Sequence, residues 1–145
     1  MRVLVQRVSS ARVEVEGKTT GQIGQGLLLF VGFGRDDQAA VIPAAVKKIL
    51  EMRVFSDCAG KLNLSLADVG GAALVVSQFT LYANCGRGRR PDFTPAAPPQ
   101  LAEELYNGFV GLLVQHSIPV QTGIFAADMQ VSLVNDGPVT FFLEF

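Results

Sequence analysis

Hydrophobic and polar residues alternate at the start of the chain, and this period of two predicts strands. We expect two short strands, Met1 to Val8 and Ala11 to Val15, followed by a turn at Gly17-Lys18. Leu27 to Phe33 is apolar without alternation, which is typical of a central strand covered on both faces. The N-terminal part of the chain is therefore predicted to be a β-meander that leads into the middle of a sheet.

Two segments carry the spacing of amphipathic helices instead. The first is expected to start near Ile42, with Pro43 in its first turn. The second opens at Pro98-Pro99, and its buried face is predicted at Leu101, Leu105, Phe109, Leu112 and Leu113. Further strands are predicted at Arg53 to Phe55, Ala72 to Gln78, Val120 to Phe125, Met129 to Val134 and Val139 to Phe145.

The 145 residues, of which 49% are apolar, fit one domain that spans residues 1–145 and buries roughly two-thirds of its unfolded surface. We expect an α/β fold with a mixed, mostly antiparallel sheet or barrel-like core and two main helices. The longest apolar stretch is far shorter than the roughly 20 residues of a membrane-spanning helix, so no membrane association is expected. Phenylalanines emerge on both faces of the last strand, which favours a homodimer that covers them.

Cysteine and histidine usage argues against disulfides and metal. Cys58 and Cys85 are far apart and have no secretory signal beside them, which favours free thiols in a reducing cytoplasm. The single histidine, His116, and two scattered cysteines fall short of the three or four ligands of a zinc site. Neither a metal nor another cofactor is expected.

The net charge of −1 excludes a protein that coats nucleic acid by bulk electrostatics. A nucleic-acid partner would have to be bound through contacts at one local site. A candidate binding loop contains three arginines among glycines, Arg87, Arg89 and Arg90. A solvated loop without a ligand is at least as good an interpretation.

Two segments carry the candidate chemistry. Ser77-Gln78-Phe79-Thr80 follows a buried strand, and Gly137-Pro138 interrupts the last strand pattern. An X-Pro bond reaches the cis state at a cost of about 0.5–1 kcal/mol, so backbone carbonyls can be aimed unusually there. Asp136-Gly137 is also a hairpin signal, and a simple turn stays open. Thr80 has no neighbouring base, and its β-propensity is the favoured explanation for it.

Several segments together resemble the D-aminoacyl-tRNA deacylase family, in the same order and spacing over nearly the whole chain. They are Gln6-Arg7-Val8, Ser77-Gln78-Phe79-Thr80-Leu81, Arg90-Pro91-Asp92-Phe93, Leu105-Tyr106, Phe125-Ala126-Ala127-Asp128-Met129 and Asn135-Asp136-Gly137-Pro138-Val139-Thr140. The resemblance implies a homodimeric carboxylic ester hydrolase with active sites at the dimer interface. It would remove D-amino acids, and glycine mischarged on tRNA(Ala), from the 3′-terminal adenosine of tRNA while sparing L-aminoacyl-tRNA.

The resemblance also implies roles for the two motifs. Ser77, Gln78, Phe79 and Thr80 would form the catalytic segment, whose amides hold the oxyanion while the substrate's ribose 2′-hydroxyl assists hydrolysis. Gly137-Pro138 would be cis and enter the partner's site, where its carbonyls exclude L side chains.

The resemblance leads to weaker assignments for three other residues. Phe125 and Met129 would hold the terminal adenine, with ordinary core packing as an even alternative. Arg7 and the arginine loop would steady the Gly-Pro segment or meet acceptor-end phosphates. Two other functions stay open, a non-catalytic binder of aminoacylated RNA ends and an ordinary esterase that uses Thr80.

Overall fold

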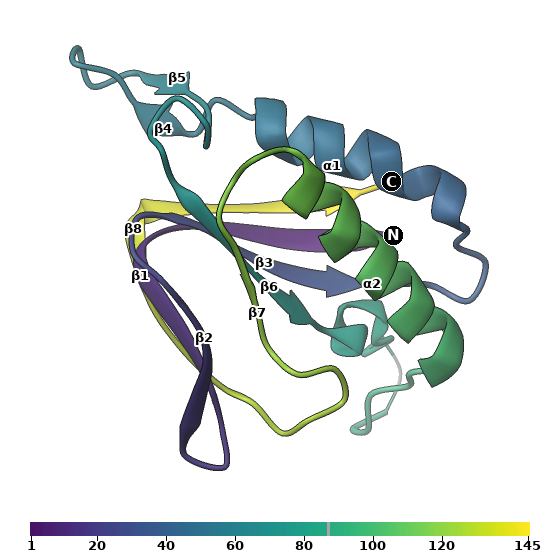
Figure 1. The fold of residues 1–145 in the computed structure, drawn as a ribbon. Helices are drawn as coiled ribbons and strands as arrows, with labels where there is room; N and C mark the ends of the chain where they lie inside the picture. Colours follow the sequence, from purple (N-terminus) through teal and green to yellow (C-terminus); the bar gives the residue numbers. More distant parts are fainter. Residues whose placement is uncertain (87) are drawn as a thin grey trace.

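The computed structural model describes residues 1–86 and 88–145, and two helices cover one face of a strongly curled sheet (Figure 1). The helices are α1 (Ile42–Glu51) and α2 (Pro99–Gln115), with 3-10 turns η1 (Ala39–Val41) and η2 (Phe79–Tyr82). The strands of the main sheet are β1 (Arg2–Val15), β2 (Lys18–Ile23), β3 (Gly26–Gly32), β6 (Ala72–Ser77), β7 (Val120–Thr122) and β8 (Gln130–Glu144). Two short strands, β4 (Phe55–Ser56) and β5 (Leu62–Leu64), pair outside it.

The main sheet is mixed, and its order is β2-β1-β3-β6-β7, with β8 paired to β1. β1 is antiparallel to β2, β3 and β8, whereas β6 is parallel to β3 and β7. The ends of the sheet curl toward each other: a Cβ built on Gly21 of β2 would lie 2.6 Å from the carbonyl oxygen of Thr122 in β7. The predicted α/β fold with a mixed, nearly barrel-shaped sheet and two helices is therefore confirmed.

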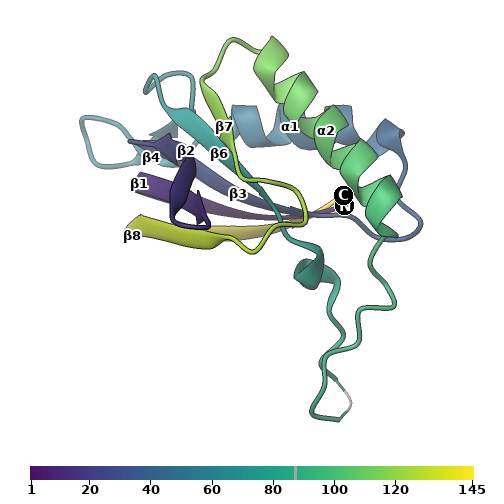
Figure 2. The same cartoon turned by 60° about the horizontal axis from the view of Figure 1, so that its bottom comes forward.

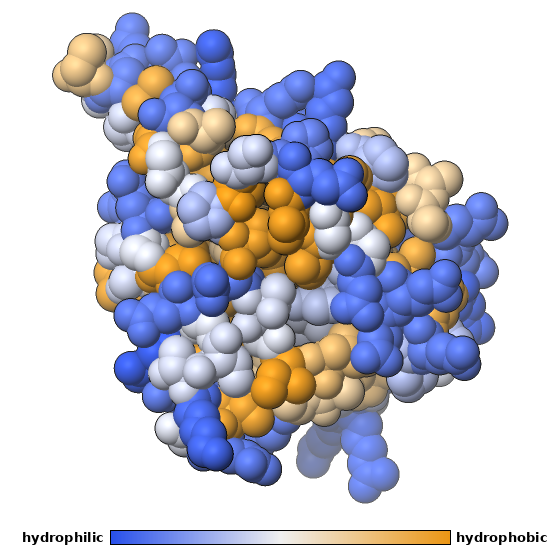
Figure 3. Space-filling model, in the orientation of Figure 1, coloured by the Kyte–Doolittle hydropathy of each residue, from blue (hydrophilic) through white to orange (hydrophobic). Residues whose placement is uncertain are grey.

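Apolar side chains fill both faces of the sheet. On the helix face, β1, β3 and β6 pack against α1 and α2, and Val3, Leu29, Ile49 and Phe109 are fully buried there. A smaller cluster on the other face lies inside the curl of the sheet. Polar side chains form much of the rim of the view in Figure 3, with apolar side chains toward its middle.

The predicted helices are confirmed. α1 starts at Ile42 with Pro43 in its first turn, and α2 starts at Pro99, because proline supplies the right φ and needs no hydrogen-bond acceptor there. Of the predicted face of α2, Leu105, Phe109 and Leu113 are buried, Leu101 and Leu112 are partly buried, and Ala102 and Tyr106 join them.

Several predicted strand boundaries are wrong. The first two predicted strands form one, β1, and its turn lies at Glu16-Gly17, both with positive φ, one residue before the predicted position. β1 stays continuous because β8 pairs with both of its halves, whereas β3 pairs with the first half and β2 with the second. The strands expected at Arg53 and Val120 are shorter or shifted, as the bounds of β4 and β7 show.

The last two predicted strands also form one, β8, because both halves pair with β1 in the same direction. Gln6 pairs with Thr140 and Val8 with Asn135, so Arg7 alone faces residues 136–139. These four residues bulge out of the strand. Asp136-Gly137 therefore makes a bulge and not the hairpin that the dipeptide also allowed.

A partly buried carboxylate, Asp37, links the end of β3 to η2. It accepts hydrogen bonds from the α-ammonium group of Met1 and the amide of Gly34, both at 2.7 Å, and from the hydroxyl of Tyr82 at 3.1 Å. Partial burial acts to raise the pKa of this carboxyl group, but these hydrogen bonds outweigh it, so the pKa of Asp37 lies below its ordinary value. Burial, and then the Asp37 charge, raise the pKa of Tyr82 to about 12, so the hydroxyl stays a donor.

We expect Asp37→Asn to lower the free energy of unfolding at pH 7 by about 2 kcal/mol, the usual effect of losing a charged hydrogen-bond partner. Because the folded-state pKa is lowered, the stabilisation is present above the ordinary pKa of 3.8 and is lost as the pH falls through the folded value. Urea unfolding at pH 7 and pH 2.5 measures this, with Asp36→Asn as the control. An equal loss of stability at both pH values would contradict the assignment.

Candidate functional site

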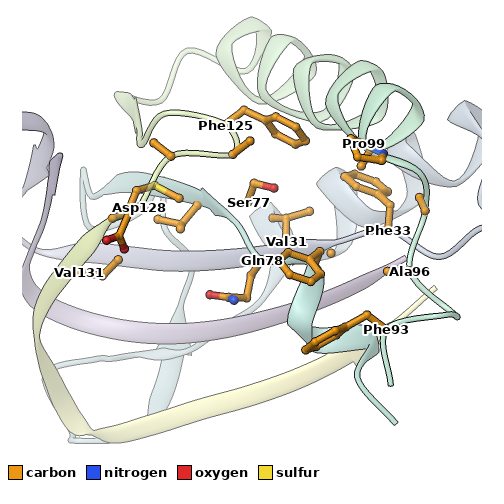
Figure 4. A pocket seen from close by; sticks show the side chains of 18 residues that line it. Val31, Phe33, Ser77, Gln78, Phe93, Ala96, Pro99, Phe125, Asp128 and Val131 are labelled. Carbon is orange, nitrogen blue, oxygen red and sulfur yellow. The ribbon is translucent and has the colours of Figure 1, made fainter. Parts of the chain in front are cut away.

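A cavity of about 580 Å³ opens where the parallel strands β3 and β6 end (Figure 4). The ends of parallel strands are a usual place for a ligand site, because the chain leaves the sheet there and no side chain fills the space. Loops after β6 and β7, the start of α2 and the start of β8 close the remaining sides. The lining is mostly apolar, so it suits an organic group with apolar faces.

The Ser77-Gln78-Phe79-Thr80 segment lies at one side of this cavity. The amide of Gln78 still donates to Val31 at 2.8 Å, as in a sheet, and η2 begins at the next residue. The half-buried side chains of Ser77 and Gln78, and the exposed ring of Phe79, line the cavity. Thr80 is exposed, does not line the cavity, and accepts a hydrogen bond from the Gln78 side-chain amide.

The backbone amides of Phe79 and Thr80 are the first two of η2. The turn closes only at the Leu81 amide, which donates to the carbonyl of Gln78 at 3.3 Å. The two preceding N–H groups therefore have no acceptor within the helix, as at every helix start. They are donors beside the cavity that can stabilise negative charge on an oxygen atom.

Phe125 and Met129 also line the cavity, and both lie on the loop between β7 and β8. In Figure 4, Phe125 lies on the side of α2, across from Ser77. Its ring centroid is 5.9 Å from that of Tyr106, whose hydroxyl donates to the carbonyl of Val75 at 2.9 Å. Burial raises the pKa of Tyr106 to about 12, so this donor persists at physiological pH.

The same loop holds Met129 in place through its backbone. Ala126 has a φ of 59°, which is uncommon for a residue with a side chain and belongs to functional loops more often than to ordinary ones. A Cβ atom on Gly123 would collide with the sulfur of Met129. Only glycine at position 123 therefore lets Met129 lie where it does.

The Gly-Pro bulge does not reach the cavity of its own chain. The Gly137-Pro138 peptide bond is cis, and neither residue lines the cavity. Arg7 is buried beside the bulge: its Nε atom is 3.1 Å from the carbonyl oxygen and from Oδ2 of Asp136, and its Nη1 donates to Val54 at 2.7 Å. The structure thus separates Arg7, Gly137 and Pro138 from the other predicted site residues.

Phe93 is a lining residue to which the sequence interpretation gave no role. It lies in a loop rich in proline and arginine, and its ring meets that of Phe79 edge to face, with centroids 5.1 Å apart. The sequence placed Phe93 in a segment that carries the family resemblance, Arg90-Pro91-Asp92-Phe93, but its pairing with Phe79 required the fold. Of the arginine loop, Arg89 and Arg90 are exposed, and Arg87 lies outside the described residues.

No group of three or more His, Cys, Asp or Glu side chains within residues 1–86 and 88–145 could hold a metal ion. No helix of these residues is both long enough and apolar enough to span a membrane. Cys58 and Cys85 are exposed free thiols.

Comparison with known proteins gives one consistent match. The model of the family described as D-Tyr-tRNA(Tyr) deacylase matches residues 4–144. D-Aminoacyl-tRNA deacylases of Alcanivorax borkumensis and Thermosipho africanus are 55% and 52% identical over 144 residues, which cover 99% of this chain and 99% and 97% of those proteins. A solved structure of a c-Myc DNA unwinding element binding protein has a TM-score of 0.94 and 40% identity, and the match covers 100% of this chain and 99% of that one.

These matches extend over the full set of elements described above, from β1 to β8. They confirm the family expected from the sequence motifs. Because the relatives are deacylases, which are hydrolases, the predicted enzyme class is confirmed as well. The chain belongs to the D-Tyr-tRNA(Tyr) deacylase family.

Proposed function

We propose that the protein is a cytoplasmic, homodimeric deacylase that removes D-amino acids from tRNA, and glycine from mischarged tRNA(Ala). One observation carries this proposal. The cavity brings Ser77, Gln78 and Phe79 together with Phe125 and Met129, across about 50 residues of sequence, in a mostly apolar site beside free backbone amides. Such a site suits a nucleoside whose ester carbonyl lies against hydrogen-bond donors.

In the proposed complex, the terminal adenine lies between Phe125 and Met129, by ring stacking and by contact with the soft sulfur. The ester carbonyl then points to the amides of Phe79 and Thr80. Water attacks this carbonyl, the amides hold the oxyanion, and the bond to the ribose 3′-oxygen breaks as that oxygen takes up a proton. The neighbouring 2′-hydroxyl assists this transfer, so no side-chain base is needed. Thr80 positions Gln78 through their hydrogen bond.

Selection of the D configuration is assigned to the Gly137-Pro138 bulge of the second copy. In a dimer, its backbone carbonyls would press on one face of the α-carbon and collide with an L side chain. Glycine has no side chain to exclude, so the same site would accept it. The position of the bulge outside its own cavity supports this role, because only a second copy can supply it.

The shape of β8 supports a dimer. Within the described part of the chain, β8 is a 15-residue edge strand that pairs only with β1, and Val134 and Phe142 on it are 57% and 50% exposed. A long edge strand with exposed apolar side chains makes a monomer prone to aggregation. A second copy of the chain that covers β8 removes this exposure.

Hydrolysis rates of D-tyrosyl-tRNA, L-tyrosyl-tRNA and glycyl-tRNA test the proposal directly. We expect the D-tyrosyl and glycyl esters to be cleaved and the L-tyrosyl ester to survive at the same enzyme concentration. Equal cleavage of the D and L esters would instead indicate a general esterase. Tight binding without cleavage would indicate a protein that only holds aminoacylated RNA ends.

A further inference from the structure

An arm of the chain leaves the body of the protein beside the cavity, between η2 and α2 (Figure 2). Its described residues are 83–86 and 88–98. Two backbone hydrogen bonds of 2.7 and 3.0 Å pair Asn84 with Asp92, so the two legs of the arm run antiparallel. The arm is therefore a defined extension and starts at the rim of the cavity.

The base of the arm is fastened to the end of β3. The amide of Ala97 donates to the carbonyl of Phe33 at 2.9 Å, and the amide of Arg35 donates to the carbonyl of Pro95 at 3.1 Å. The guanidinium group of Arg35 also donates to the carbonyl of Thr94. These hydrogen bonds fix the position of the returning leg relative to the cavity.

The surface between cavity and arm combines aromatic rings with positive charge. Phe79 and Phe93 both line the cavity, yet they are 52% and 39% exposed. Arg89 and Arg90 on the arm are exposed, and neither belongs to an ion pair found among the described residues. Arg90 is three residues from Phe93, which limits their backbone separation to about 10 Å.

We propose that the Phe79–Phe93 pair and the arm arginines Arg89 and Arg90 form a binding track for the unpaired nucleotides that precede the terminal adenosine of the substrate RNA. Exposed aromatic rings stack on bases of any sequence, and neighbouring arginines neutralise the phosphates between them. This inference rests on the proposed function, which places the terminal adenosine in the cavity. It also explains how a protein with a net charge of −1 holds RNA, by a local grip at one edge.

The rings of the track also line the cavity, but only the longer RNA can reach the whole track, so the ratio of two substrates isolates its contribution. We compare kcat/KM for D-tyrosyl-tRNA with kcat/KM for D-tyrosyl-adenosine. Phe93→Leu, and the double variant Arg89→Ala/Arg90→Ala, are each expected to lower the tRNA-to-adenosine ratio by about tenfold or more. For the double variant, the slope of log kcat/KM against log salt concentration should become shallower by about 0.7 for each phosphate that the arginines no longer neutralise.

Two matched controls accompany these variants. One removes two positive charges away from the track, and the other keeps an aromatic ring at position 93. Lys47→Ala/Lys48→Ala removes two exposed charges from α1, and Phe93→Tyr keeps a stacking ring; both should keep the wild-type ratio. The proposed track would be contradicted if the tRNA-to-adenosine ratio of kcat/KM stayed unchanged in the Phe93→Leu and arginine variants. An equal loss of kcat/KM with both substrates leaves this ratio unchanged and counts as the same result. The affinity of the same variants for an uncharged RNA ending in CCA tests the track without turnover, so its failure is distinguishable from failure of the proposed reaction.

Discussion

Gly137→Ala is expected to make the enzyme cleave L-aminoacyl-tRNA, with the ratio of D-tyrosyl-tRNA to L-tyrosyl-tRNA hydrolysis falling by at least tenfold. Gly137 has a φ of 123°, a backbone conformation that residues with a side chain rarely adopt. An added Cβ would lie 2.7 Å from Nη2 of Arg7 and 3.0 Å from Cγ2 of Val139. Arg7 is buried and bound to Asp136 and Val54, so the bulge has to move instead.

Under the proposed mechanism, a displaced bulge would no longer present its carbonyls to the α-carbon, and selection by exclusion would be lost. The matched control is Gly17→Ala, because Gly17 also has a positive φ, of 73°, but has open space around its missing Cβ. Both variants carry backbone strain of order 1–3 kcal/mol, whereas only one touches the proposed filter. Unchanged selectivity in a folded Gly137→Ala variant would remove the bulge from the proposed mechanism.

Removal of the substrate's 2′-hydroxyl is expected to lower the rate of deacylation by about 10²- to 10⁴-fold, the usual contribution of a positioned proton-transfer group. D-Aminoacyl-tRNA that ends in 2′-deoxyadenosine, measured in single turnover, tests this. The reason lies in the cavity: Thr80 is exposed and outside the lining, and its hydroxyl is engaged with Gln78. Among the lining residues that the structure describes, Asp128 carries the only ionisable side chain, and no hydrogen bond joins it to the segment from Ser77 to Thr80.

Thr80→Ala distinguishes catalysis assisted by the substrate's 2′-hydroxyl from catalysis by a Thr80 nucleophile. Under the proposed mechanism this variant keeps most of its kcat, because the hydroxyl only positions the Gln78 side chain. An ordinary esterase with Thr80 as its nucleophile shows the opposite pair of results, a dead Thr80→Ala variant and a 2′-deoxy substrate cleaved at the normal rate. Binding of an uncharged RNA end by Thr80→Ala shows that any loss is chemical and not structural.

Elements that depend on local signals were predictable from the sequence. Pro43 and Pro98-Pro99 mark the starts of both helices, because proline suits the first turn of a helix and disrupts its interior. The uninterrupted apolar run of β3 predicted a central strand, and β3 does lie between β1 and β6. These features need no knowledge of which segments meet.

Features that depend on pairing between distant segments were mispredicted. Met1 to Val8 and Ala11 to Val15 were predicted as two strands, but β8 follows β1 along both of its halves and keeps the strand continuous. Asp136-Gly137 has the local signature of a hairpin, and pairing of both flanks with β1 turns it into a bulge. Long-range hydrogen bonds overrode the local preference in both places.

The sequence motifs alone pointed to the family and to two sets of candidate residues, since Ser77 to Thr80 and Gly137-Pro138 carry the resemblance. Only the tertiary structure showed that Phe125 and Met129 share a cavity with Ser77, that the Gly-Pro bulge lies outside it, and that Phe93 belongs to its lining. The physical reason is that periodicity along a chain encodes which face of an element is buried. It does not encode which distant side chains meet at that face, because register and loop packing decide this.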